Sequence, residues 1–229
     1  MSKTNTQIFM TLFTAVFVTT MGAGFVAPLL PVYAHDLGAG GFEIGLIFAA
    51  FSLTRTLFVP YFGKLSDRRG KKGLLTTGLL LYFLLAILYV LLKGIVFLIL
   101  LRLAQGFASA MILPVAQAYV GDITPRLKEG HVMGLFNLSL YGGLSAGPVL
   151  GGVVRDTFNS IQAAFVGMGI LTGMGFILCL FFLPPENRKS VKQLGRLDQT
   201  PAGYLALLRS RTVFSLFAFR SCFTTCIGI

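Results

Sequence analysis

A ten-residue stretch between two apolar segments combines five basic residues with a single carboxylate. It runs Gly63-Lys-Leu-Ser-Asp-Arg-Arg-Gly-Lys-Lys72, and the carboxylate is Asp67. Its two glycines permit a tight chain reversal and a close approach of backbones. A carboxylate near a helix start can cap that helix and pair with Arg68 or Arg69. An ordinary basic loop beside a membrane would account for the five basic residues. It would not account for the spacing of the glycines, the aspartate and the arginine.

Two arginines lie inside apolar segments, where a charge is costly. Arg102 precedes Gln105 by three residues, so both fall on one side of a helix and can share a partner. Arg55 lies 12 residues before Asp67, which places it about 18 Å along a helix from the basic loop. An arginine at such depth costs about 2.5–3.5 kcal/mol and normally faces a polar interior. Arg55 predicts either a site for an anionic group or pairing with polar helix neighbours.

The acidic residues, unlike these two arginines, lie outside the middle of the apolar segments. All eight fall in loops or at helix ends: Asp36, Glu43, Asp67, Asp122, Glu129, Asp156, Glu186 and Asp198. Proton coupling usually needs a protonatable group in the transport pathway. A protein that moves protons across a membrane would therefore use an acid outside these apolar segments, use Glu43 or Asp36 near segment ends, or couple to protons in another way.

Other chemistry is disfavoured by the sequence. The three cysteines, Cys179, Cys222 and Cys226, lie in apolar runs and are interpreted as small apolar side chains. His35 and His131 lie near helix ends and are interpreted as solvated. We find no metal-ligand spacing, phosphate loop or nucleophile constellation, so we expect no enzyme, no metal and no cofactor.

The composition indicates an integral membrane protein. The 229 residues are 55% hydrophobic and only 12% charged, with a mean hydropathy of +0.81. Soluble domains carry about 25% charged residues. The formal net charge is +11, but the bases sit in short loops rather than on one face. Nucleic acid is therefore not an expected partner, whereas a lipid bilayer is.

Six apolar segments are long enough to span about 30 Å of hydrocarbon, which needs about 20 residues. They are Ile8–Tyr33, Glu43–Phe62, Leu74–Leu92, Ile95–Val120, Met133–Val154 and Ala163–Leu183, and a seventh begins near Thr212. The first is too long an apolar stretch for a signal peptide. The expected fold class is an all-α membrane protein, a six-transmembrane-helix bundle with the start of a seventh helix.

The basic residues predict the orientation and the domain organisation. Lys and Arg concentrate in the connections on one side, whereas only Lys93 and Arg155 lie in connections on the other. This bias predicts a cytoplasmic N-terminus. We expect a transmembrane bundle over residues 1–183, a basic cytoplasmic linker over 184–211, and a truncated seventh helix over 212–229.

Three patterns resemble the major facilitator superfamily of transporters. Gly63, Asp67, Arg68, Gly70 and Lys72 match its loop motif Gly-x-x-x-Asp-(Arg/Lys)-x-Gly-x-(Arg/Lys)-(Arg/Lys), although Gly73 stands where a final base is usual. The segment from Leu98 to Ala110 looks like its Leu-x-x-x-Arg-x-x-Gln-Gly motif. The segment from Gly143 to Gly152 matches Gly-x-x-x-Gly-Pro-x-x-Gly-Gly, which is characteristic of proton-driven exporters in that family.

The resemblance implies roles for particular residues. A conformational latch would comprise Gly63, Asp67, Arg68, Gly70, Lys72 and Asp122, with Asp122 paired to the bases of the loop. Proton coupling would involve Arg102, Gln105 and Gly106, although Arg102 could instead be a structural arginine bonded to backbone carbonyls. A hinge and seal would comprise Gly143, Gly147, Pro148, Gly151 and Gly152. The substrate candidates are Arg55, Phe25, Phe51, Met111 and Asn137, with Phe107 and Tyr141, and for the aromatic ones a lipid-facing position is equally open.

The expected function is alternating-access transport between two six-helix halves, of which this chain would be the first. Our first hypothesis is a proton-driven exporter of small drug-like molecules in a bacterial inner membrane, using the proton gradient and no cofactor. A second is a symporter or facilitator for a small, anionic metabolite held by Arg55. A third is a six-helix membrane module that pairs or scaffolds without transport. The missing half would be the same chain continued, or a second copy.

Overall fold

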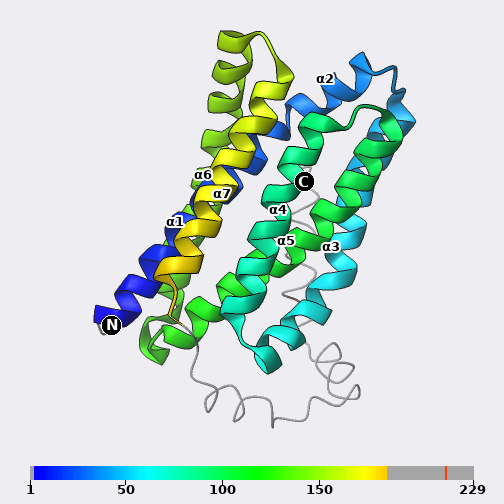
Figure 1. Cartoon of the computed structure of the whole chain (residues 1–229). Coiled ribbons are helices and arrows are strands. Elements are labelled where there is room, and N and C mark those ends of the chain that lie inside the picture. Colours follow the sequence, from blue (N-terminus) through cyan, green and yellow to red (C-terminus); the bar gives the residue numbers. More distant parts are fainter. Residues whose placement is uncertain (1–2, 185–214, 216–229) are drawn as a thin grey trace. The chain divides into compact units, whose positions relative to one another are not determined.

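The computed structural model describes residues 3–184 and residue 215, and in this part of the chain every regular element is helical. The elements are α1 (Lys3–Val26), α2 (Leu29–Asp36), α3 (Gly41–Arg69), α4 (Lys71–Leu91), α5 (Ile95–Ile123), the short 3-10 helix η1 (Arg126–Lys128), α6 (Glu129–Phe158) and α7 (Ile161–Phe182) (Figure 1). All of them belong to one compact unit, residues 1–191. The expected linker and seventh helix lie almost wholly outside the described residues.

The helices have the length and composition of membrane spans. Five candidate spans meet both criteria: α1 together with α2, then α3, α4, α5 and α7. Helix α6 has 30 residues, which is ample length, but its seven glycines and several polar side chains lower its hydropathy. The expected all-α membrane bundle is thus confirmed.

Two boundaries differ from the sequence-based expectation. The first span is broken, because α1 ends at Val26 and α2 begins after Pro28, which lacks a backbone N–H. The second span continues beyond Phe62, so the first part of the basic stretch is helical and not loop. The helix α3 ends only where Gly70 adopts a φ of +95°, a conformation that other residues rarely tolerate.

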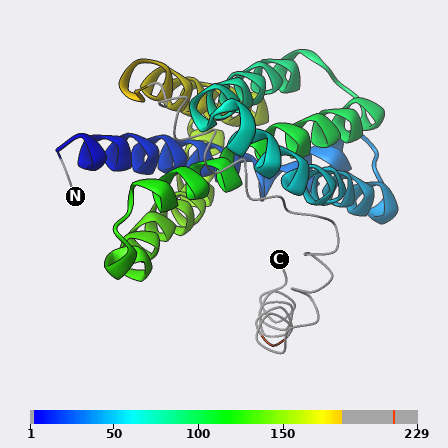
Figure 2. The same ribbon diagram turned by 90° about the horizontal axis from the view of Figure 1, so that it is seen from below.

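The helices pack in a defined order around two central helices, α1 and α5. Extensive contacts join α3 to α5, α5 to α4, α4 to α7, α7 to α1 and α1 to α6 (Figures 1 and 2). The contact pattern is unchanged when α1 is exchanged with α5, α3 with α6, and α4 with α7. The bundle therefore consists of two equivalent three-helix units, one of α1, α3 and α4 and the other of α5, α6 and α7. Helices α3 and α6 are the outermost members of the series. Helix α3 rests mainly on α5, and α6 rests mainly on α1.

Backbone-to-backbone contact seats both outer helices. On α6, an added Cβ at Gly147 would lie 2.6 Å from the Cα of Gly24 on α1, and one at Gly151 would lie 2.7 Å from the carbonyl oxygen of Phe25. On α5, a Cβ at Gly106 would collide with the carbonyl oxygen of Phe51 on α3. Glycine at these positions lets the helices approach closely, which is how helices associate in lipid.

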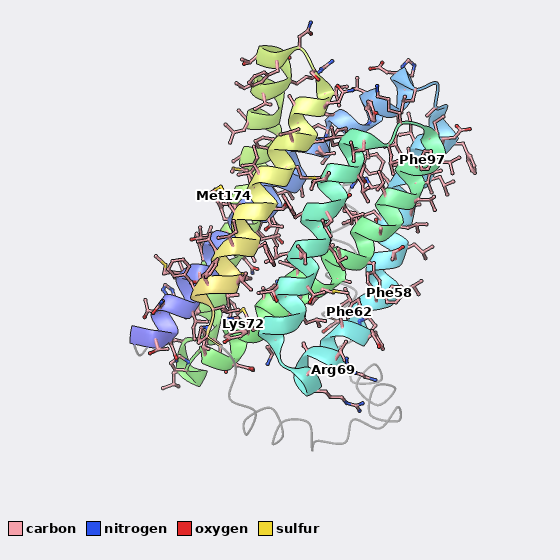
Figure 3. The ribbon with its side chains drawn as sticks, viewed as in Figure 1. Phe58, Phe62, Arg69, Lys72, Phe97 and Met174 are labelled. Carbon is pink, nitrogen blue, oxygen red and sulfur yellow. The ribbon has the colours of Figure 1, made fainter. Side chains whose placement is uncertain are left out.

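Figure 3 identifies the two ends of the bundle by labelled side chains. Lys72 and Arg69 lie at one end, and Phe97 lies at the other. We call these the Lys72 end and the Phe97 end. Met174, on α7, points outward and is half exposed.

The close contact of α6 with α1 at Gly143, Gly147 and Gly151, which we call the glycine seam, gives a direct test of this packing. We expect Gly147→Ala to destabilise the bundle by about 1–3 kcal/mol, because the new methyl group meets backbone that cannot move aside. Gly152→Ala is the matched control, since nothing lies within 4 Å of its added Cβ, and it should be neutral or stabilise by up to about 1 kcal/mol. Thermal unfolding of both variants in detergent measures the difference, and equal effects would contradict the seam.

Candidate functional site

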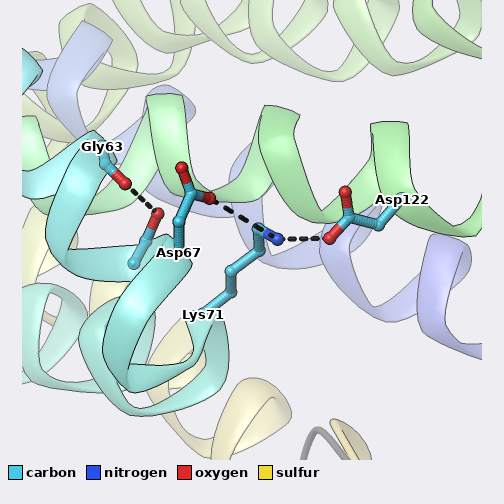
Figure 4. A network of polar contacts seen from close by, with 5 residues as sticks. Gly63, Asp67, Lys71 and Asp122 are labelled. Carbon is cyan, nitrogen blue, oxygen red and sulfur yellow. Dashed lines mark hydrogen bonds and ion pairs between the residues drawn. The ribbon is translucent and has the colours of Figure 1, made fainter. Parts of the chain in front are cut away.

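The junction between α3 and α4 holds a three-residue ion cluster. Lys71, the first residue of α4, is nearly fully buried, and its Nζ donates a hydrogen bond to Oδ2 of Asp122 near the end of α5. The same Nζ lies 3.9 Å from Oδ1 of Asp67 in the last turn of α3 (Figure 4). We call Asp67, Lys71 and Asp122 the clamp. It joins three helices at the Lys72 end.

Helix electrostatics explain why the clamp needs two acids. A cation at a helix N-terminus is unfavourable, because the macrodipole places partial positive charge there. No side chain caps the start of α4, so the acids offset both the dipole and the buried ammonium. The expected pairing of Asp122 with a base of this stretch is present, and the base is Lys71.

The expected role of Asp67 at a helix start is wrong. Asp67 lies inside α3, so it cannot cap α4, and its ion pair is with Lys71 rather than with Arg68 or Arg69, which are exposed. The latch predicted from the sequence includes Lys72 and not Lys71. The i, i+4 spacing of Asp67 and Lys71 was the signal that could have found it.

Further bonds tie the neighbouring helix ends together. The Nζ of Lys72 donates to the carbonyl oxygen of Leu183, just after α7. The hydroxyl of Tyr119 donates to the carbonyl oxygen of Pro184 at 3.5 Å, and Nδ2 of Asn5 donates to that of Ile123 at 3.1 Å. Helix C-termini leave unsatisfied carbonyls, and these side chains supply their partners.

A second polar cluster lies buried between α4 and α5. Nη1 of Arg102 donates to Oε1 of Gln105 at 3.1 Å, and the hydroxyl of Tyr89 donates to the same oxygen at 3.1 Å. Nε2 of Gln105 donates to the hydroxyl of Tyr82 at 2.8 Å. We call Tyr82, Tyr89, Arg102 and Gln105 the polar network. Gln105 therefore links one nitrogen of Arg102 to both tyrosines of α4: its Oε1 accepts from Arg102 and Tyr89, and its Nε2 donates to Tyr82.

The other side of Arg102 faces α3 and lacks polar partners. Its guanidinium carbon lies 5.5 Å from the ring centroid of Phe48 and 5.6 Å from that of Phe51. Stacked rings attract a cation, but they accept no conventional hydrogen bond. Nε and Nη2 are buried without a hydrogen-bond partner among the described residues, and Arg102 has no carboxylate partner there. The arginine is only 7% exposed.

The sequence placed Arg102 and Gln105 together correctly but missed both tyrosines. The alternative of an arginine bonded to backbone carbonyls finds no support, because its recorded bond goes to the Gln105 side chain. Tyr82 and Tyr89 lie seven residues apart on α4, a spacing that puts both on one helix face. Gly106 follows Gln105 and lies where α5 meets α3 near Phe51. Arg55 is half buried one turn farther along α3.

The remaining substrate candidates are not gathered in one place. Phe25 is buried with its ring against the position of Gly167 on α7, and Met111 is buried against Gly78 of α4. Asn137 on α6 is half buried.

Two aromatic candidates occupy other positions. Phe107 packs edge-on against Phe58 and Phe62, with centroid distances of 4.8 and 5.0 Å, and Tyr141 is exposed. The assignment of all these residues to a substrate surface stays a prediction.

Four of the five hinge candidates lie along the seam between α1 and α6, and Gly152 does not. Pro148 is inside α6 and does not end the helix, and its Cδ would lie 3.3 Å from a Cβ at Gly24. Gly143, Gly147 and Gly151 are all buried against α1, whereas Gly152 faces away from other helices. Among residues 3–184, no group of three or more His, Cys, Asp or Glu side chains is placed to hold a metal ion.

Comparisons with known proteins agree with this architecture. The family model of the Major Facilitator Superfamily matches residues 12–229. The uncharacterised MFS-type transporter MJ1560 of Methanocaldococcus jannaschii is 36% identical over 171 residues, which are 75% of this chain and 44% of that protein. The quinolone resistance protein NorA of Staphylococcus aureus is 29% identical over 195 residues, 85% of this chain and 49% of NorA. The chain thus spans about half the length of these relatives.

A solved structure shares the fold. The human organic anion transporter MFSD10 (TETRAN) superposes with a TM-score of 0.74 over 93% of this chain and 59% of its own, at 16% sequence identity. The bundle order, the multiple apolar spans and the family match lead to one conclusion: this chain is a multi-pass membrane protein that belongs to the Major Facilitator Superfamily.

Proposed function

We propose that this chain forms one half of a secondary active transporter that exports small drug-like molecules by alternating access, driven by the proton gradient. The N-terminus would face the cytoplasm, and a bacterial inner membrane would be the host. Support comes from the family match and from the similarity to a quinolone resistance protein. Because the chain spans about half of its relatives, a second six-helix half, continued or supplied by another copy, would complete the pathway.

The observation that carries the proposal is the half-satisfied Arg102. A buried donor without a partner costs about 1–3 kcal/mol, and a membrane arginine is costly in addition. The polar network holds one side of the guanidinium, while Nε and Nη2 stay unpartnered behind Phe48 and Phe51. Such donors suit an acidic group that is ionised in one conformation and protonated in the other.

The proton would be carried by that acidic group and not by Arg102, which stays charged. Its carboxylate would bind the free guanidinium donors when α3 moves relative to α5, and would release them on protonation. The acid would come from the second half, or from Glu43 or Asp36 near the Phe97 end. The clamp at the opposite end would hold the bundle in one conformation as a latch. The seam of Gly143, Gly147, Pro148 and Gly151, together with Gly152 beside it, would act as hinge and seal.

A second candidate rests on Arg55. This arginine is half buried next to the α3–α5 contact and would hold the anionic group of a metabolite in a symporter or facilitator. The two arginines therefore separate the two hypotheses.

Flux measurements in proteoliposomes test the proposal. The vesicles would contain the chain alone, or the chain with a second six-helix half, and ethidium would serve as the drug-like probe. We expect ethidium movement against its gradient when a pH difference is imposed, and its collapse when a protonophore removes that difference. Flux that ignores the pH difference would overturn proton coupling, and absence of flux in every assembly would favour a non-transporting module.

Substitutions at the two arginines give a sharper prediction. We expect Arg102→Gln and Arg102→Lys each to reduce proton-driven ethidium flux about tenfold or more, equivalent to about 1.4 kcal/mol, because neither side chain can both bond Gln105 through one nitrogen and present the two open donors Nε and Nη2. Arg55→Gln should leave ethidium flux within about twofold, a change of well under 1 kcal/mol. Thermal unfolding must show that all three variants fold. If Arg55→Gln abolishes ethidium flux and the Arg102 variants do not, the coupling role proposed for Arg102 is wrong.

The clamp gives a stability prediction. Asp122→Asn should destabilise the bundle by about 1–3 kcal/mol, since it leaves the buried ammonium of Lys71 with a weaker partner. Asp67→Asn is the matched control and should cost about 1 kcal/mol or less, because its carboxylate is similarly exposed but lies 3.9 Å from the Lys71 Nζ, with no hydrogen bond to it. Lys71→Met combined with Asp122→Asn should recover part of the loss, which unfolding in detergent measures as a double-mutant cycle. Strictly additive effects would contradict the clamp.

A further inference from the structure

An apolar groove opens between α4 and α7 near the Phe97 end. Its cavity volume is about 240 Å³. The lining consists of apolar residues from two helices: Phe83, Ala86, Ile87, Val90, Leu91, Phe165, Val166, Gly169 and Ile170. Small residues face each other across the seam, since an added Cβ at Gly169 would lie 3.4 Å from that of Ala86. This pairing leaves the space that larger side chains would fill.

Both walls of the groove belong to candidate membrane spans, so its opening lies at the depth of the hydrocarbon. Ile87, Leu91, Val166 and Ile170 are 41–68% exposed along its rim. Apolar cavities stay dry because they offer water no hydrogen bonds. We propose that this groove binds one acyl chain of a bilayer phospholipid whose phosphate lies at Lys93.

The dimensions and the charge fit that occupant. From Phe83 to Leu91 the lining covers about 12 Å along α4, close to the depth of one leaflet, since the hydrocarbon core is about 30 Å thick. Lys93 follows Leu91 by two residues and is exposed. Lys93 therefore follows the end of α4 that lines the groove, and a lipid phosphate is the anion expected where a span leaves the membrane.

The rear wall of the groove also supports the polar network. The ring of Phe165 stacks on that of Tyr89, with centroids 5.0 Å apart and planes 15° from parallel. The hydroxyl of Tyr89 bonds Gln105, which bonds Arg102. An acyl chain against Phe165 would hold Tyr89 in place, so lipid binding should also raise the thermal stability of the bundle.

Photolabelling tests the proposal directly. The full chain in detergent micelles would be titrated with phosphatidylglycerol that carries a diazirine in one acyl chain, and labelled peptides would be located by mass spectrometry. We expect saturable labelling within residues 83–91 and 165–170, together with an increase in melting temperature. Labelling that never saturates, or that spreads evenly over the exposed faces of α3 and α7, would overturn the site and leave only annular lipid.

Matched variants separate groove from surface. Ile170 and Ile177 lie seven residues apart on the same face of α7 and are 60% and 52% exposed, but only Ile170 lines the groove. We expect Ile170→Trp to abolish the saturable labelling and Ile177→Trp to preserve it, with unfolding curves confirming that both variants fold. Equal behaviour of the two variants would contradict the proposal.

The phosphate contact has its own test. Loss of one lysine near the lipid surface costs about 1 kcal/mol, so Lys93→Gln should weaken phosphatidylglycerol binding about fivefold. Lys128→Gln, an exposed lysine at the opposite end, is the control and should change nothing. A diazirine diacylglycerol, which lacks phosphate, should bind both proteins weakly and equally. Unchanged phosphatidylglycerol binding by Lys93→Gln would exclude Lys93 as the phosphate site.

Discussion

Close backbone contact between an outer and a central helix is the constraint on which the rest of this bundle depends. Within lipid, apolar side chains gain little by leaving the solvent, so helices associate through tight packing and polar contacts. Helix α6 reaches α1 at Gly147 and Gly24, and α3 reaches α5 at Gly106. Each contact lets one helix approach another without intervening side chains. A side chain at either contact would separate the helices and shift every group that depends on their spacing.

The α3–α5 contact also determines what surrounds the buried charge. Gln105 directly precedes Gly106, and Arg102 lies one turn earlier on α5. Where Gly106 meets α3, Phe51 is brought over the guanidinium. The clamp then joins the far ends of the same helices, because Asp122 is on α5, Asp67 is in the last turn of α3 and Lys71 begins α4. Any displacement of α3 along α5 therefore changes both the cover on Arg102 and the geometry of the clamp.

The sequence predicted the parts of this arrangement that follow from local pattern. Hydropathy identified the spans, and the spacing of Arg102 and Gln105 placed them on one helix face, where they bond. The break at Pro28 was missed because the apolar run continues through it. Tyr82 and Tyr89 were missed because a tyrosine in an apolar helix has the same local pattern whether it faces lipid or a buried amide. The sequence pattern favoured Lys72 over Lys71 as a latch residue, because only the tertiary fold decides which of two adjacent bases meets Asp122.

The polar network is asymmetric, and this asymmetry bears on its use. Toward α4, Gln105 is bonded to two tyrosines and to Arg102, so that side is fixed by hydrogen bonds. Toward α3, the guanidinium meets only aromatic rings, and two of its nitrogens have no partner among the described residues. A purely structural arginine would gain stability from partners on both sides. Arg102 is instead held by Gln105 on one side and leaves two donors open on the other, toward α3.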